Sequence, residues 1–110
     1  MIEILIKEYL EKTLNVPIFL EHQGKMPDSF VIFEKTSSSY KNKINYSTFA
    51  FQSYGKTMYE AAKINDDLKD AIFNIVKLKE IGSVKLNSDY NFTDTTTKKY
   101  RYQAVFDFVY

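Results

Sequence analysis

The stretch VKLNSDYNFTDTTTKKYRYQAVFDFVY, residues 84–110, decides the fold of this chain. It contains two runs in which apolar and polar residues alternate, separated by the polar linker Thr93–Lys98. The alternating apolar positions are Val84, Leu86, Tyr90 and Phe92 in the first run, and Tyr100, Tyr102, Ala104, Phe106, Phe108 and Tyr110 in the second. Successive side chains of a strand point to opposite faces. The stretch therefore predicts a long amphipathic hairpin with an aromatic inner face.

Two helices are expected upstream of this hairpin. Ile2–Thr13 has apolar residues at helical spacing and charged residues on the other side. A second helix is expected from Thr57 to about Val76, beginning with a capping box between Thr57 and Glu60. Its apolar stripe is Ala61, Ile64, Leu68, Ala71, Ile72 and Ile75. Charged residues between them, including Lys69, are expected to face water.

Three strands are expected between the helices. Val16–Glu21 is a short apolar run, and Phe30–Lys35 is apolar on both faces. Ile44–Tyr54 changes the parity of its apolar residues, which indicates either a bulge near Ser47 or partial burial of both faces. We favour the second, with an assembly interface covering the outer face. The serine-rich segment Thr36–Lys43 is expected to be a flexible projecting loop.

These elements predict one α+β domain over residues 1–110. The order is α-β-β-β-α-β-β, with an antiparallel sheet of about five strands and both helices on one face. The hydrophobic fraction of 45% is sufficient for a core. The net charge of +1 gives no support for a duplex-binding stripe, and the chain has no Cys. With no signal-like start and no membrane span, we expect a soluble intracellular domain.

No residue pattern predicts catalysis, a cofactor or a metal. Ala50–Thr57 ends in Gly-Lys-Thr between a strand and a helix, like a P-loop, but bulky Phe51 and Tyr54 stand where phosphates would approach the backbone. His22 is the only His and has no companion ligands, and Asp66, Asp67 and Asp70 alternate with lysines on a solvated helix face. We therefore expect a protein that is not an enzyme.

The surface residues instead favour a role in contact. Lys41, Lys43, Lys98, Lys99 and Arg101 lie in or beside the two polar loops. If both loops project to the same side, these residues form a modest basic rim, which would suit a protein partner. The nine Phe and nine Tyr could belong to an aromatic-rich core or be partly exposed at an interface.

Four motifs resemble the small tail terminator, or tail completion, proteins of long-tailed phages and Gram-positive prophages. They are KLNSDYNFTD (85–94) followed by KYRYQAVFD (99–107), the Leu-Asn-Val-Pro exit of the first helix, the central AFQSY (50–54), and YEAA (59–62) at the start of the second helix. The resemblance covers nearly the whole chain in order and length. The motifs bear the fold and carry no catalytic residue.

The resemblance implies a structural protein that forms a ring, typically a hexamer, on the tail tube. Such a ring ends tube polymerisation and offers a surface to a head completion or connector protein, without cofactor, nucleic-acid specificity or membrane. It would assemble in the host cytoplasm and remain in the virion tail. As hypothetical contact residues we name Ser38, Tyr40, Lys41, Lys43, Phe49, Phe51, Asp94, Thr96, Lys98 and Arg101.

Two alternatives remain open at this stage. One is another neck or adaptor protein of the same particle, which would assemble on the portal side. The other is a small ligand-binding domain or enzyme, which requires a pocket with convergent polar groups. Nucleic-acid binding through the interleaved Tyr and Lys residues near Arg101 is a weaker third alternative.

Overall fold

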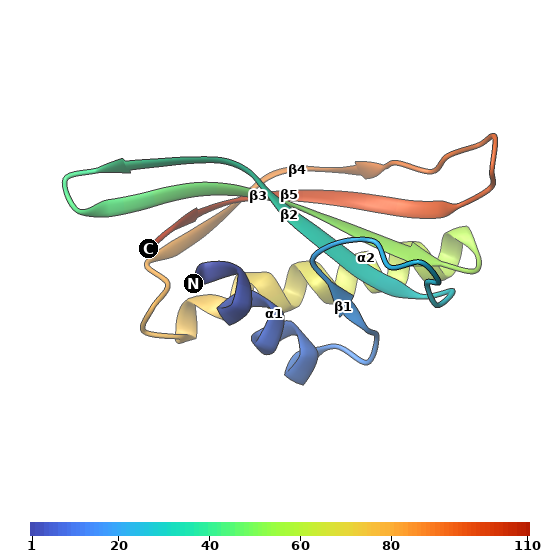
Figure 1. Ribbon diagram of the computed structural model, residues 1–110, viewed down its shortest axis with the longest axis horizontal. Helices are drawn as coiled ribbons and strands as arrows, with labels where there is room; N and C mark the ends of the chain where they lie inside the picture. Colours follow the sequence, from blue (N-terminus) through green and yellow to red (C-terminus); the bar gives the residue numbers. More distant parts are fainter.

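Both helices pack on one face of a five-stranded sheet in the computed structural model, which describes residues 1–110 (Figure 1). The elements are α1 (Ile2–Thr13), β1 (Ile18–Phe19), β2 (Phe30–Lys41), β3 (Ile44–Gly55), α2 (Met58–Phe73), the 3₁₀ helix η1 (Asn74–Lys77), β4 (Ser83–Asn91) and β5 (Tyr100–Val109). The strand order is β1-β2-β3-β5-β4. The predicted α+β class and element order are confirmed.

The sheet was predicted to be antiparallel but is mixed, because β1 pairs in parallel with β2 while every other pair is antiparallel. The first predicted strand, Val16–Glu21, is reduced to Ile18 and Phe19. Pro17 has no amide proton to donate, although its carbonyl accepts a hydrogen bond from the amide of Val31 at 3.0 Å. The short β1 therefore forms one edge of the sheet without extending it far.

The helices form where the apolar spacing predicts them. All six residues of the predicted stripe on the second helix are buried, and helical structure continues through η1 to Lys77. Thr57 caps α2, because its hydroxyl accepts a hydrogen bond from the amide of Glu60 at 3.1 Å. Only half of the predicted capping box forms. The carboxylate of Glu60 accepts instead from the hydroxyl of Ser29, which ties α2 to the start of β2.

Five phenylalanines form the centre of the core beneath the sheet. They are Phe33, Phe49, Phe51, Phe106 and Phe108, each no more than 1% exposed. Phe33 and Phe51 stack with ring centroids 5.1 Å apart, and Phe49 meets Phe108 edge to face at 5.2 Å. The proposal that Phe49 and Phe51 are outer contact residues is therefore wrong. Their parity in β3 directs both rings towards the helices.

The other face of β3 is also partly buried, as expected. Ala50 and Tyr54 point away from the helices and are about as buried as core residues, at 5% and 6% exposure. The register between β3 and β5 is continuous from Tyr46 to Gly55, so no bulge interrupts β3. The irregularity lies in the partner strand, between Lys35 and Ser37 of β2.

The segment Thr36–Lys43 is not a flexible loop. β2 continues to Lys41 and pairs residue by residue with β3, leaving only Asn42 and Lys43 as the turn. Both turn residues have positive φ, at 53° and 64°, which is the conformation of a two-residue hairpin turn. The serine-rich segment was not predicted as a strand because it has no alternating apolar residues. It still forms a strand, since ladder hydrogen bonds join backbone groups and need no apolar side chain. The hairpin projects well beyond the helices (Figure 1).

A bulge also changes the outer half of the C-terminal hairpin. Leu86 pairs with Phe106 but Ser88 pairs with Val105, so Asn87 is an extra residue. Beyond it the faces exchange. Tyr90 and Phe92, expected on the inner face, lie on the opposite face with exposures of 41% and 39%. The second strand follows its predicted parity, with Ala104, Phe106 and Phe108 buried.

Candidate functional site

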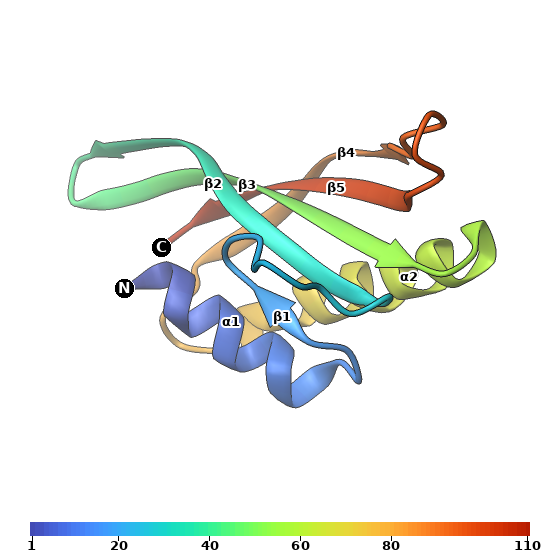
Figure 2. The ribbon, with the colours of Figure 1, turned by 45° about the vertical axis from the view of Figure 1, so that its right-hand side comes forward.

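The face of the sheet opposite the helices has no second layer of secondary structure over it (Figures 1 and 2). We call it the open face. Its residues are Phe30, Ile32 and Glu34 of β2, Ala50, Gln52 and Tyr54 of β3, Arg101 and Gln103 of β5, and Tyr90 of β4. Only the chain that follows β1, residues 20–29, borders it on one side. This face is therefore the side of the sheet that the helices leave free.

An ordered row of rings crosses the open face near the ends of the strands. Phe30 and Tyr54 stack with centroids 4.4 Å apart and planes 13° from parallel. His22 meets both rings edge-on, at 6.3 and 6.2 Å. The guanidinium of Arg101 lies 5.7 Å from the Tyr54 ring and 4.4 Å from the Phe92 ring. Ring stacking and cation–π contacts of this kind stabilise the packing of these side chains on the sheet.

Arg101 is held by hydrogen bonds as well as by stacking. Its Nε donates to the carbonyl of Phe92 at 2.6 Å, and its Nη1 donates to the hydroxyl of Tyr54 at 2.8 Å. Arg101 points outward from the sheet, as its parity predicts, but it is half-buried. Its hydrogen bonds connect Tyr54 of β3 with Phe92, the residue after β4, so its first role in this chain is structural.

Polar side chains beside the row also bond to one another. Gln52 Nε2 donates to Gln103 Oε1 at 2.8 Å, and Gln103 in turn donates to the hydroxyl of Tyr90. The hydroxyl of Tyr54 donates to Gln52 Oε1 at 3.3 Å. This network links three neighbouring strands, and it makes the middle of the open face polar.

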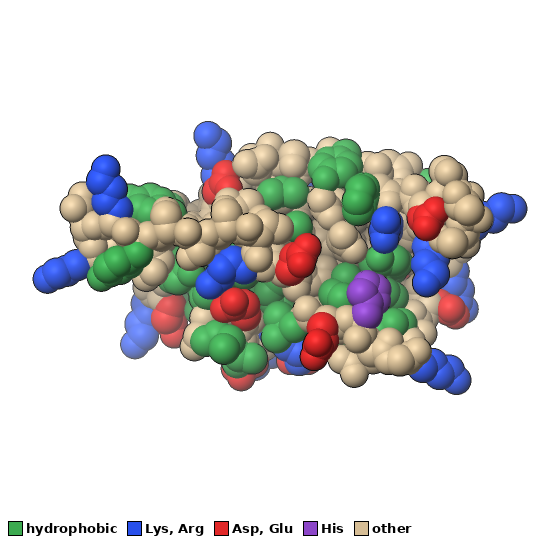
Figure 3. Space-filling model, turned by 45° about the horizontal axis from the view of Figure 1, so that its top comes forward, with side chains coloured by type: hydrophobic (Ala, Val, Ile, Leu, Met, Phe, Trp, Pro, Cys, Tyr) green, Lys and Arg blue, Asp and Glu red, His purple; other side chains and the backbone are tan.

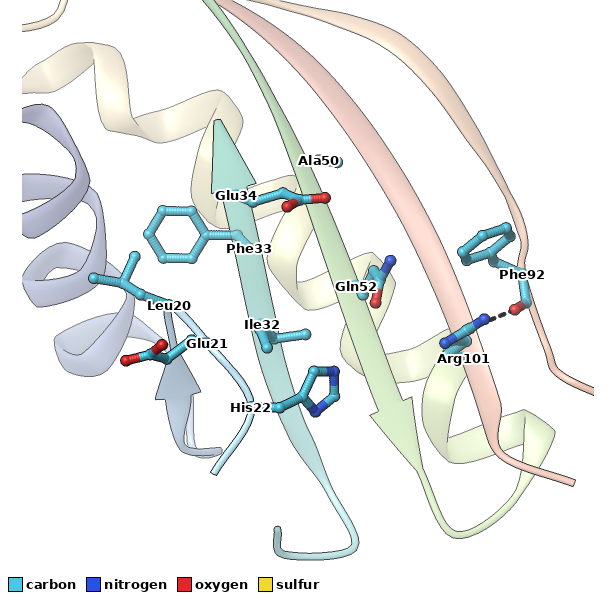
Figure 4. A pocket seen from close by; sticks show the side chains of 10 residues that line it. All are labelled: Leu20, Glu21, His22, Ile32, Phe33, Glu34, Ala50, Gln52, Phe92 and Arg101. Atoms are coloured by element: carbon cyan, nitrogen blue, oxygen red, sulfur yellow. Dashed lines mark hydrogen bonds between the residues drawn. The ribbon is translucent and has the colours of Figure 1, made fainter. Parts of the chain in front are cut away.

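A hollow of about 500 Å³ lies between this surface and the chain after β1 (Figure 4). Its apolar part comes from Leu20, Ile32 and Ala50, and its carboxylates are those of Glu21 and Glu34. Both carboxylates are exposed, and neither forms an ion pair within the chain. We call the part lined by Leu20, Glu21, Ile32 and Glu34 the acidic groove.

The hairpin of β2 and β3 brings four of the predicted contact residues together. We call residues 36–46 the arm. Ser38, Tyr40, Lys41 and Lys43 all lie on it and are exposed. Three large apolar side chains of the arm are exposed as well, namely Tyr40 at 66%, Tyr46 at 42% and Ile44 at 39%. The contact residues predicted from the sequence included Tyr40 but not Ile44 or Tyr46. Residues 36–43, which pair with this part of β3, were expected to be a loop.

The C-terminus runs beside the β3 strand of the arm almost to the turn. Tyr110 and Asn45 exchange two backbone hydrogen bonds, of 2.8 and 3.0 Å, and the Tyr110 hydroxyl contacts the Ser47 hydroxyl at 2.8 Å. The arm therefore leaves the domain in a defined direction.

The three remaining predicted residues, Asp94, Thr96 and Lys98, lie in the loop between β4 and β5. Asp94 Oδ1 accepts from the amides of Thr96 at 3.0 Å and Thr97 at 3.4 Å. Hydrogen bonds from Thr97 and then Thr96 hold the pKa of Asp94 below its ordinary value. This loop projects from the end of the sheet opposite to the arm (Figure 1), in a molecule 45 Å long. The two loops therefore do not form one basic rim.

The other candidate positions of the sequence take structural roles. Ala50–Gly55 is regular strand followed by the turn into α2. Lys69, expected to face water, reaches Asp89 of β4, and the hydrogen bond with this carboxylate raises the pKa of Lys69. His, Asp and Glu side chains form no group of three or more that could hold a metal ion. Neither helix has the length and apolar character needed to cross a membrane.

The open face, the acidic groove and the arm thus form the candidate site, and its geometry suits contact with another macromolecule. In comparisons with known proteins, the chain matches no family model and no curated protein.

Proposed function

We propose that this chain is a structural phage tail protein that assembles into a ring on the end of the tail tube. The observation that carries the proposal is the arm. It extends beyond the helices with Tyr40, Ile44 and Tyr46 exposed. The C-terminal strand accompanies it as far as Asn45, and only the turn and the residues next to it extend further. A projecting ribbon with apolar side chains on both of its faces is suited to burial against a partner.

The distribution of surfaces supports a ring. The arm leaves one end of the sheet (Figure 1). The acidic groove lies further along the open face, between β2 and the chain that follows β1 (Figure 4). A contact between two different patches of the same chain is head-to-tail, and it closes into a ring when its rotation closes. This matches the ring that the sequence resemblance implies.

In the proposed role the ring caps the tube and stops its polymerisation. One end of the ring contacts the tail tube protein, and the other end offers a surface to the head completion or connector protein. The β4–β5 loop, which projects opposite to the arm, is suited to one of these two contacts. Assembly would take place in the host cytoplasm, and the ring would remain in the virion tail.

The test is to polymerise the tail tube protein of the same particle with and without this chain, and to measure tube lengths by electron microscopy. We expect short tubes with a ring density at one end. The variant Tyr40→Asp with Ile44→Asp should lose capping, because it places charge on the apolar arm. Tyr59→Asp is the matched control, since Tyr59 is 79% exposed on α2, away from the arm.

Tube lengths that do not respond to the wild-type chain would contradict the proposal. If the chain then bound the portal-side connector, the result would favour another neck or adaptor protein. Saturable binding of a small molecule in the hollow beside His22, with no binding to either particle component, would favour a ligand-binding domain.

A further inference from the structure

We propose that the acidic groove is the receptor for the arm of a second copy of this chain. In this contact, Lys41 and Lys43 of one copy face Glu21 and Glu34 of the next, while Ile44 and Tyr46 cover Leu20 and Ile32. The inference deepens the proposed function, on which it rests for the closure of the contact into a ring.

Charge complementarity is the first argument. Residues 36–48 contain Lys41 and Lys43 and no acidic residue. Neither lysine forms an ion pair within its own chain, whereas Lys35 at the base of the arm is paired with Glu3 at 3.5 Å. The groove offers the unpaired carboxylates of Glu21 and Glu34. In Figure 3, Lys or Arg side chains stand at the arm end of this face, and its middle carries Asp or Glu side chains with Lys or Arg side chains beside them. Opposite charges placed in this way set the register of an interface and its association rate.

The apolar side chains match in the same orientation. Lys41 is directly opposite Ile44 in the ladder, and Ser39 is opposite Tyr46, so Lys41, Ile44 and Tyr46 lie on one face of the arm. In the groove the carboxylates likewise flank apolar Leu20 and Ile32, which are 36% and 8% exposed. Each of the two surfaces therefore combines apolar side chains with neighbouring charged ones. The charged side chains are basic on the arm and acidic in the groove.

The occupant must come from another copy. The arm is a ladder of β2 and β3 anchored by Tyr110, and in both ribbon views it extends away from β1 and the chain that follows β1, which border the groove. A contact in which the grooves of two copies face each other would instead bring Glu21 and Glu34 of one copy towards the same carboxylates of the other. Like charges placed together oppose association. Insertion of an arm is the arrangement that pairs the groove carboxylates with cations.

A charge-exchange experiment tests this contact. The reversed-arm chain carries Lys41→Glu and Lys43→Glu, and the reversed-groove chain carries Glu21→Lys and Glu34→Lys. Alone, each variant should self-associate at least about tenfold more weakly than the wild type, since two attractive pairs become repulsive. Mixed in equal amounts, the two variants should associate again, because every arm then meets a groove of opposite charge. Native mass spectrometry should show oligomers with equal numbers of the two chains.

The matched control is Lys12→Glu with Lys79→Glu, which makes the same charge change away from the arm and the groove, and it should associate like the wild type. Circular dichroism checks that every variant is folded. The contact is wrong if the wild type stays monomeric up to millimolar concentration even with tail tube ends present, if the single variants associate normally, or if the mixture fails to recover. Normal assembly of both variants with intact tube capping would reject this contact and leave the proposed function standing. If the mixture associates again but the chain does not cap tubes, the contact is supported and the proposed function is rejected.

Discussion

At the scale of single residues, Arg101 shows how a charged side chain can become part of the architecture. Its guanidinium stacks on Phe92 and donates to both the Phe92 carbonyl and the Tyr54 hydroxyl. A planar group with several donors can satisfy stacking and hydrogen bonding together, which a lysine ammonium cannot. The alternation of β5 predicted that Arg101 points outward. Its partners could not be predicted, because Phe92 reaches this face only through the bulge at Asn87.

Tyr9 provides a prediction at this scale. Its hydroxyl donates to the carbonyl of Ala71 at 2.7 Å and so joins α1 to α2. Burial of the ring raises the pKa of Tyr9 above its ordinary value of 10.0. Tyr9→Phe should lower the free energy of unfolding by about 1 kcal/mol at neutral pH, because it removes a buried hydrogen bond. Urea denaturation measures the change, and Tyr59→Phe is the exposed control.

The same substitution has a defined pH dependence. Because the pKa of Tyr9 is raised in the folded chain, its contribution is fully present below pH 10 and is lost as the pH rises through the folded value. The difference in stability between the wild type and Tyr9→Phe should therefore be constant from neutral pH to about pH 9 and shrink above pH 10. A difference that grows on the alkaline side would contradict the assignment.

At the scale of elements, the two helices and the C-terminal hairpin were predictable because their periodicity is local. Every residue of the apolar stripe on α2 is buried, as the spacing of 3.6 residues per turn requires. The arm was not predictable in the same way. Its serines carry no alternation of apolar residues, and the ladder there depends on the partner strand rather than on the segment itself.

The faces of the strands were predictable only up to the first bulge. Sequence parity placed Val84 and Leu86 on the inner face correctly, and it failed for Tyr90 and Phe92 beyond Asn87. β3 contains no bulge, so its side chains alternate regularly between the two faces of the sheet. Which face is the outer one could not be assigned until the helices were placed. This is why Phe49 and Phe51 were assigned to the wrong side, while the residues of the arm tip were placed on the surface correctly.

Deletion of Asn87 tests the account of the bulge. Since Leu86 and Ser88 already pair with consecutive residues of β5, the deletion should yield a regular strand with Tyr90 and Phe92 still on the open face. We expect a change in the free energy of unfolding of less than about 1 kcal/mol. Nuclear Overhauser contacts between Tyr90 and Gln103 would report the retained face.

Deletion of Ser53 is the matched control for this prediction. Ser53 lies in β3, whose register with β5 has no extra residue, so its removal moves one end of the strand to the wrong face. This variant should not fold. Loss of folding on deletion of Asn87 as well would show that the bulge is required by the fold.

At the scale of the whole molecule, the residues that form the core and the residues proposed to contact other molecules lie in different places. The helices and the five core phenylalanines lie on one side of the sheet, while the open face, the acidic groove and the arm carry little of that core. A domain built in this way can retain its fold while its surfaces pair with neighbours. In the proposed ring each copy would offer an arm and receive one, and this separation would suit that role.

The most direct test of self-assembly is native mass spectrometry of the wild-type chain over a concentration series, alone and with tail tube ends present. We expect a closed oligomer of one size, a hexamer if the resemblance to tail terminators holds, whose population rises with concentration or with added tube ends. A chain that remains monomeric in both conditions, with its arm unprotected from proteolysis, would contradict the account.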